Sequence, residues 1–307
     1  MDFIETTYRN AVLIWNPSAG RRRQNRRREI ETAKLALNNA GIAVSTQQTD
    51  NAGEGAIAAR KAIEGGADLI IACGGDGTIN DVLGGMAGSR VPLAILPGGT
   101  ANVLARELGF PLTIPAAAQI LPQCRAQRIA LGNIGQRYFI LMAGIGFDAQ
   151  VVYSVSRRWK KLFGMSTYVP QALRQLFSQP LHPFVLISGR RRLRATFACI
   201  ARAQYYGPFR LIREASLLSD QFYVYAFASS NPLRYFSYTA ALLMRRQSRL
   251  PDFTGFPARE IRCEQIPSNG TKTFLQVDGE FAGELPCTIS IVPDALTLLM
   301  PPAQDYA

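Results

Sequence analysis

The stretch LIIACGGDGTIN, from Leu69 to Asn80, joins an apolar run to a glycine-rich turn and then to a segment that can form a helix. Such a run is typical of a buried strand in a parallel sheet, and a glycine turn before a helix is typical of a phosphate-binding loop. Asp76 stands in the middle of this turn. A carboxylate within about 4 Å of a phosphate costs on the order of 4 kcal/mol at an effective dielectric of roughly 20, so Asp76 needs a partner there.

Three roles for Asp76 stay open at this point. It can hold Mg²⁺ that bridges to the phosphate, or it can take a proton from an attacking hydroxyl. It can also cap the loop by accepting hydrogen bonds from loop amides.

The segments around this stretch alternate between strands and helices. Strands are predicted at 11–16, 43–49, 68–74 and 92–96, and helices at 21–40, 53–66, 78–87 and 101–108. Helices of this length between apolar strands form βαβ units, so we expect an α/β domain whose parallel sheet has helices on both faces. Ligands of such sheets bind at the carboxyl ends of the strands.

The pattern changes after about residue 125. Strands with tight turns are predicted within 138–149, 183–203, 221–228, 272–292 and 296–300, and helices near 157–178 and 231–246. The SGRR stretch at 188–191 is typical of a hairpin connection. We therefore expect an α/β domain over 1–125 and a mostly antiparallel β-rich domain over 126–290, with about 290–307 packing back on the first domain.

Composition narrows the class of protein. A chain of 307 residues suits two domains, and its net charge of +12 favours an anionic partner. His182 is the only histidine, and none of the five cysteines forms a C-x-x-C pair, so neither a zinc site, a disulfide framework nor a histidine-based dyad is expected. With no apolar window of about 18 residues and no leader pattern, we expect a cytoplasmic protein, and a peripheral location at the inner membrane surface stays open.

Three glycine-bearing turns follow predicted strands of the first domain: Asn16–Gly20, Gly74–Thr78 and Pro97–Asn102. All three fall at the carboxyl edge of the sheet, where backbone N–H groups and helix N-termini can hold phosphate. Neither a G-x-x-x-x-G-K-[ST] loop nor a G-x-G-x-x-G fingerprint after the first strand is present, so neither a P-loop nor a Rossmann dinucleotide site is predicted.

These motifs carry a resemblance. GGDGTIN, NPSAG and PGGTANVLARELG, with AGIGFDA at 143–149 and QVDGE at 276–280, resemble the diacylglycerol kinase catalytic-domain family, which includes bacterial soluble lipid kinases and sphingosine and ceramide kinases. The resemblance covers nearly the whole chain. It implies an ATP-dependent kinase that phosphorylates a lipid hydroxyl, diacylglycerol or sphingosine-like, with a nucleotide cleft between the two domains.

The same resemblance implies roles for individual residues. ATP would contact Asn16, Pro17, Ser18, Ala19, Gly20, Thr49, Gly74, Gly75, Asp76, Gly77, Thr78, Ile79, Asn80, Asp81, Thr100 and Asn102. Glu280 would be the proton acceptor, with Asp278 and Asp76 as rivals. An accessory Mg²⁺, distinct from the one that ATP carries, would be held by Asp220 and by the backbone carbonyls of Leu217 and Phe222, and the substrate head group would contact Asp148.

Simpler interpretations accompany two of these roles. QVDGE offers two carboxylates on one turn, as phosphoryl transfer requires, but it is also the sequence of an ordinary acidic hairpin. Asp220 can equally be a plain turn residue in LLSDQF.

Arginine runs at 21–28, 157–163 and 190–194 leave further alternatives open. The first run would attract ATP or an anionic membrane surface, or remain a solvated face. RRWKKLF at 157–163 suits an interfacial helix or an ordinary packed one, and 190–194 a hairpin tip. A nucleic-acid binder and an NAD kinase are the rival functions. Because no nucleic-acid motif accompanies the runs, we expect a lipid and a membrane as partners but no nucleic acid, and a homodimer stays open.

Overall fold

A computed structural model describes residues 8–18, 20, 25–154, 168–178, 180–267 and 272–302, with side chains from 172 onward in the segment 168–178. The chain divides into two units, which we call unit 1 (residues 1–129 and 294–307) and unit 2 (residues 130–293). The sequence analysis places these divisions at 125/126 and near 290.

Unit 1 is built on a parallel sheet in the order β2-β1-β3-β4. Its strands are β1 (Ala11–Trp15), β2 (Val44–Gln48), β3 (Leu69–Gly74) and β4 (Leu93–Pro97). The second half of β18 (Cys287–Met300) joins them in parallel, with Leu298 opposite Leu93. Strands β3 and β4 are buried along their whole length, which explains why they carry almost only apolar residues.

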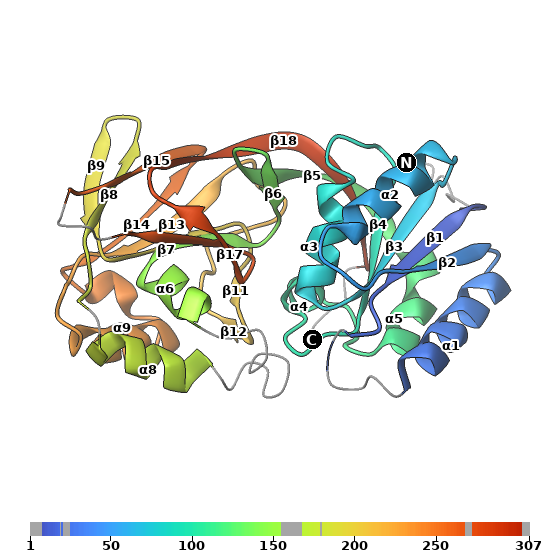
Figure 1. The fold of residues 1–307 in the computed structure, drawn as a ribbon, viewed down its shortest axis with the longest axis horizontal. Helices are drawn as coiled ribbons and strands as arrows, with labels where there is room; N and C mark the ends of the chain where they lie inside the picture. The colour runs from blue at the N-terminus through green and yellow to red at the C-terminus, as the bar shows by residue number, and fades with distance from the viewer. Residues whose placement is uncertain are drawn as a thin grey trace. The chain divides into compact units, whose positions relative to one another are not determined.

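Two helical layers cover this sheet, in which α1 packs with α5 and α2 with α3 (Figure 1). The helices are α1 (Arg26–Asn39), α2 (Glu54–Glu64), α3 (Asp76–Gly84), α4 (Val103–Leu108) and α5 (Ile114–Ile120), followed by the 3₁₀ turn η2 (Leu121–Gln123). The α/β architecture predicted for this part of the chain is confirmed. Helix α5 was not predicted, because its seven residues are too few for a helical period to stand out.

The described residues of unit 2 form two large, mostly antiparallel sheets and a two-stranded sheet of β11 with β12. One has the order β14-β13-β10-β7-β16-β17, and the other contains β15, β8 and β9 beside the first half of β18. The strands are β5 (Arg125–Ile134), β6 (Arg137–Phe139), β7 (Met142–Gly146), β8 (Phe184–Ser188), β9 (Arg191–Ala195), β10 (Phe197–Ala201), β11 (Tyr205–Tyr206), β12 (Phe209–Arg210), β13 (Phe222–Phe227), β14 (Phe253–Ala258), β15 (Glu260–Gln265), β16 (Phe274–Val277) and β17 (Glu280–Glu284). Both sheets contribute to one core, through Phe184 and Ile261 on one side and Ile145 and Val224 on the other. The predicted β-rich class is therefore confirmed.

Three helices accompany these sheets: α6 (Phe147–Ser154), α8 (Tyr168–Ser178) and α9 (Arg234–Leu243), followed by the turn η4 (Gln247–Arg249). The predicted strand at 138–149 was wrong at its end, because Phe147 begins α6. Gly146 ends β7 with a φ of +75°, and a Cβ there would lie 2.4 Å from the Thr196 carbonyl oxygen, so only glycine permits this change of direction. The predicted helix near 157–178 is confirmed over α8, and its earlier part, including RRWKKLF, lies outside the described residues.

The predicted hairpin at 188–191 is also confirmed, since Ser188 pairs with Arg191 where β8 meets β9. Strand β9 ends its sheet, and its exposed arginines suit an edge strand that must not pair with another chain. Within the described part of the chain, no helix is long and apolar enough to cross a membrane.

Candidate functional site

Four loops follow the parallel strands of unit 1, and all lie at the carboxyl edge of the sheet. Because the strand order is β2-β1-β3-β4, the connections diverge between β1 and β3, which is where ligands bind such sheets. After β1, the Asn16 side-chain oxygen accepts a hydrogen bond from the Ser18 N–H at 2.7 Å and closes the turn. After β2, the buried Thr49 hydroxyl donates to the Trp15 carbonyl at 3.3 Å.

The loops after β3 and β4 pack backbone against backbone. The Gly98 N–H donates to the Gly74 carbonyl at 2.7 Å. A Cβ on Gly99 would lie 2.5 Å from the Gly75 Cα, and one on Gly20 would lie 2.2 Å from the Gly98 carbonyl oxygen. The glycines of three motifs are therefore required for the loops to approach one another, in addition to any contact they make with phosphate.

Asp76 takes part in the same loop pair. One of its carboxylate oxygens accepts a hydrogen bond from the Leu104 N–H at 3.2 Å, in the first turn of α4. Of the three roles left open for Asp76, this structure contains the cap. Asp76 is also the first residue of α3, where a negative charge is favoured by the helix dipole. A helix N-terminus presents backbone N–H groups that can bind an anion, which is the arrangement that the phosphate-binding prediction for this motif requires.

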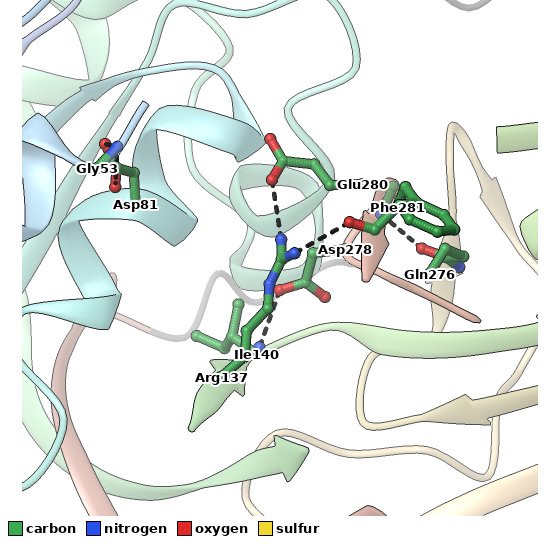
Figure 2. Close-up of polar contacts among 9 residues, drawn as sticks. Gly53, Asp81, Arg137, Ile140, Gln276, Asp278, Glu280 and Phe281 are labelled. Atoms are coloured by element: carbon green, nitrogen blue, oxygen red, sulfur yellow. Dashed lines mark hydrogen bonds and ion pairs between the residues drawn. The ribbon is translucent and has the colours of Figure 1, made fainter. Parts of the chain in front are cut away.

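Two further residues predicted to contact ATP, Asn102 and Asp81, have side chains that form hydrogen bonds with backbone groups of nearby loops. Asn102 has a φ of +48°, and its amide accepts from the Gly99 N–H at 2.8 Å and donates to the Gly99 carbonyl at 3.2 Å. Asp81 accepts from the N–H groups of Gly53 at 3.0 and 3.1 Å and of Gly55 at 2.9 Å, which caps α2 (Figure 2). These side chains shape the loops around the site.

The other residues predicted to contact ATP differ in how accessible they are to solvent. Pro17, Ser18, Gly77, Thr78 and Thr100 are exposed or half-buried at the loops, whereas Ile79 and Asn80 are buried within α3. Ala19 lies outside the described residues.

Arg26 is buried, so it does not belong to a solvated arginine face, which was one interpretation of the first arginine run. Its side chain is 3% exposed, donates to the Gly98 carbonyl at 2.5 Å and lies 3.2 Å from the Glu29 carboxylate. Arg27 and Arg28 are exposed, as a solvated face predicts, and Arg21–Arg23 lie outside the described residues. An arginine in a basic run gives no sequence signal that distinguishes it as the one that anchors a loop.

In unit 2, the QVDGE turn connects β16 to β17 and presents its two carboxylates differently. Asp278, at a φ of +48°, accepts from three backbone N–H groups: Ile140 at 3.0 Å, Leu141 at 3.0 Å and Met142 at 2.9 Å. This carboxylate fixes the turn onto the start of β7 (Figure 2).

Glu280 faces outward from the same turn. Its side chain is 48% exposed, and one carboxylate oxygen lies 2.8 Å from a guanidinium nitrogen of Arg137. Arg137 also donates to the Phe281 carbonyl at 3.2 Å (Figure 2). Among the described residues, Arg137 is the only ion-pair partner of Glu280. Arg137 was not predicted as a site residue, since nothing in its local sequence marks it.

Asp148 lies beneath this turn and is only 4% exposed. The Gln276 amide donates to it at 2.7 Å and accepts from the Gly279 N–H at 2.8 Å, and the Tyr206 hydroxyl also bonds to Asp148. Burial raises the pKa of Asp148 to about 6, while the Gln276 hydrogen bond acts in the opposite direction. The predicted contact with a substrate head group does not suit so buried a carboxylate, which instead supports the QVDGE turn through Gln276.

The residues expected to hold an accessory Mg²⁺ lie in unit 2 beside Arg202. Arg202 is fully buried, and its guanidinium donates to the Leu217 carbonyl at 2.6 Å and to the Ser219 carbonyl at 3.3 Å. Asp220 is exposed and the Phe222 side chain is buried in β13.

This arrangement does not fit a divalent cation. With a Mg–O distance of about 2.1 Å, an ion on the Leu217 carbonyl would lie only about 4 Å from the Arg202 guanidinium. Repulsion between a double and a single charge at that distance is on the order of 8 kcal/mol at an effective dielectric of roughly 20. The described residues also contain no cluster of three acidic, cysteine or histidine side chains that could hold a metal.

Comparison with known proteins agrees with the two-unit architecture. Residues 10–134 match the diacylglycerol kinase catalytic domain, and residues 142–300 match the YegS C-terminal NAD kinase beta sandwich-like domain. A diacylglycerol kinase from Staphylococcus epidermidis (strain ATCC 12228) is 26% identical over 299 residues, which are 95% of this chain and 92% of that protein.

A diacylglycerol kinase from Staphylococcus aureus (strain MRSA252) is 32% identical over 162 residues, which are 52% of this chain and 51% of that protein, so this match spans about half of the relative. The crystal structure of a diacylglycerol kinase from Bacillus anthracis has 21% sequence identity and a TM-score of 0.76, and the match covers 97% of this chain and 99% of that one. At this identity the structural likeness establishes the fold alone.

We predict that Gly99→Ala destabilises the loop pair, because its Cβ would lie 2.5 Å from the Gly75 Cα. The free energy of unfolding from denaturant titration should fall by about 1–3 kcal/mol. Gly84→Ala is the matched control, since no atom lies within 4 Å of a Cβ at that helical position, and it should leave stability unchanged or slightly higher. Equal stability of the two variants would contradict the required close approach.

We also predict a pH dependence that comes from Asp148. Its pKa is about 6 in the folded protein against an ordinary value of 3.8, so the stability that it contributes is fully present below about 3.8 and is lost as pH rises through about 6. Relative to Asp148→Asn, the wild type should lose about 3 kcal/mol between these limits. Denaturant titrations of both proteins across this range test the difference, and parallel pH profiles would refute it.

Proposed function

Because the chain belongs to the diacylglycerol kinase catalytic-domain family, we propose that it transfers the γ-phosphoryl group of ATP to the hydroxyl of a lipid. The observation that carries this proposal is the locked pair of glycine loops after β3 and β4, which leaves the first turn of α3 available as a phosphate-binding N-terminus. ATP with its Mg²⁺ would supply the phosphoryl group and neutralise its charge when bound.

The residues of unit 1 would bind and orient the nucleotide. The Asn16 turn and the GGDGT turn flank the divergence point of the sheet, where the α3 N-terminus favours an anion. Thr78, in the first turn of α3, and Thr100, on the loop after β4, are both accessible to solvent. In this proposal Asp76 acts mainly by fixing α4 against the GGDGT turn, and any contribution through Mg²⁺ is additional.

Between the two carboxylates of the QVDGE turn, we assign the proton acceptor to Glu280. A general base needs a lone pair directed at the reacting hydroxyl. Asp278 directs its oxygens at three backbone N–H groups, so few of its lone pairs stay available. Glu280 is half-exposed, and the Arg137 ion pair engages one oxygen and leaves the other to accept a proton.

Unit 2 also carries the surface that we propose for contact with the lipid bilayer. Large apolar side chains are exposed on and beside α8 and α9, and the rings of Phe177 and Phe236 lie 6.2 Å apart, which joins the two helices. This α8–α9 apolar surface consists of Leu173, Phe177, Leu233, Phe236, Leu243 and Met244. A groove of about 300 Å³ opens beside Phe177.

The charges around this surface favour an anionic bilayer as its occupant. The exposed Arg174 lies on α8, and Arg245, Arg246 and Arg249 follow the end of α9, all exposed. Apolar side chains within a basic surround are typical of proteins that insert shallowly into the interface of anionic membranes. A lipid substrate would then be drawn from the bilayer itself.

The assignment of Glu280 predicts a separation between turnover and stability. Glu280→Gln should reduce kcat on the lipid substrate by about 10²–10⁴-fold and leave the melting temperature unchanged. Asp278→Asn should lower the free energy of unfolding by about 1–3 kcal/mol, because a carboxylate that accepts three backbone N–H groups is lost. Phosphorylation assays and thermal unfolding of each variant provide the two readings.

Glu260→Gln, an exposed carboxylate on β15, is the control and should match the wild type in both measurements. A Glu280→Gln variant with wild-type turnover would remove the assignment of the base.

The membrane proposal predicts that the double variant Leu233→Ser with Phe236→Ser binds phosphatidylglycerol-containing vesicles about 10–100-fold more weakly, because two large apolar side chains leave the interface. Leu35→Ser removes a leucine on α1 that is equally exposed, at 62%, and should bind like the wild type. Vesicle sedimentation measures both. Equal binding of the double variant and Leu35→Ser would show that the α8–α9 apolar surface does not contact the bilayer.

A further inference from the structure

Arg202 is a buried cation in the core of unit 2 that the proposed reaction does not use. It follows β10 directly, and its own N–H and that of Ala203 donate to the Leu141 carbonyl at 2.8 and 3.1 Å. The side chain has no exposed surface. An arginine in such a place is expensive unless its charge is compensated, so its surroundings must explain it.

The loop before β13 turns its carbonyl groups toward this guanidinium. Two tight turns shape the loop, with the Ala215 N–H donating to Ile212 and the Ser219 N–H donating to Ser216, each at 3.1 Å. As a result, the Leu217 carbonyl meets the guanidinium at 2.6 Å and the Ser219 carbonyl at 3.3 Å. Converging carbonyl oxygens followed by a carboxylate, Asp220, are typical of a loop that holds a cation.

Burial lowers the pKa of Arg202 to about 10, while the negative charges of Asp220 and Asp278 act in the opposite direction. The guanidinium remains charged at neutral pH. Two of its nitrogens, Nε and Nη1, are buried without a hydrogen-bond partner among the described residues. The positive charge of Arg202 therefore explains its buried position better than the few hydrogen bonds that its side chain makes.

We propose that the Arg202 guanidinium takes the place of a divalent cation in the loop of residues 216–220, holding the Leu217 and Ser219 carbonyls and balancing Asp220 and Asp278. The carbonyl groups of the loop thus still point toward a cation, and that cation is the Arg202 guanidinium instead of a metal ion.

The consequence is that this part of the fold does not depend on Mg²⁺. The chain without nucleotide tests this directly. No Mg²⁺ then enters with ATP, and the result does not depend on the proposed activity. The melting temperature of the wild type should be the same in EDTA and in millimolar MgCl₂ at matched ionic strength. Asp220→Asn should respond in the same way.

Replacement of the arginine supplies the complementary test. Arg202→Asn removes the charge and leaves room for a hydrated ion, so its melting temperature in EDTA should fall by about 5–15 °C. Addition of MgCl₂ should then raise the melting temperature of Arg202→Asn until the site is saturated, because a ligand that binds the folded state stabilises it. This increase should be absent in the double variant Arg202→Asn with Asp220→Asn. Arg202→Lys keeps a positive charge and should remain insensitive to Mg²⁺.

Two results would overturn the proposal. One is a saturable Mg²⁺-dependent stabilisation of the wild type that Asp220→Asn abolishes, because the loop would then bind a metal beside Arg202. The other is an Arg202→Asn variant whose melting temperature equals that of the wild type or is not restored by Mg²⁺. If Arg202→Asn does not fold, the comparison of the wild type with Asp220→Asn still decides the question.

Discussion

The backbone contact between Gly75 and Gly99 is the constraint on which the loops at the carboxyl edge of the unit 1 sheet depend. The two loops meet so closely that neither position accommodates a side chain freely, and the Gly98–Gly74 hydrogen bond fixes their register. Asp76 then ties the start of α3 to the start of α4. The carboxylate that a phosphate would repel is thereby directed to an amide donor, while the N–H groups of the α3 first turn keep their capacity for an anion.

The QVDGE turn of unit 2 is positioned by buried polar groups in a comparable way. Asp278 holds the turn to three successive amides, and Asp148 supports it through Gln276. These two carboxylates are engaged in the structure itself, which leaves Glu280 as the acid of this turn that faces solvent. A turn fixed from beneath can present one side chain to a substrate with little loss of conformational entropy.

Much of this architecture follows from the sequence, because apolar runs and glycine turns specify strands and their ends locally. Strands β1, β3 and β4 and the hairpin at Ser188–Arg191 were predicted on this basis. Helix α6 was not, since an apolar stretch continues through Gly146 and only the positive φ of that glycine shows the change. Local patterns could not identify Arg26, Arg137 or Arg202 either, because their partners lie far away in the sequence.

The most direct measurement of the central claim is product analysis after incubation with γ-labelled ATP and Mg²⁺. The acceptors should be diacylglycerol, monoacylglycerol, sphingosine, ceramide and phosphatidylglycerol in vesicles, with NAD and DNA in parallel reactions. We expect label on the hydroxyl of one lipid class, identified by mass spectrometry. We also expect ATP, but not DNA, to protect the protein from thermal unfolding. Label on NAD with none on any lipid would contradict it.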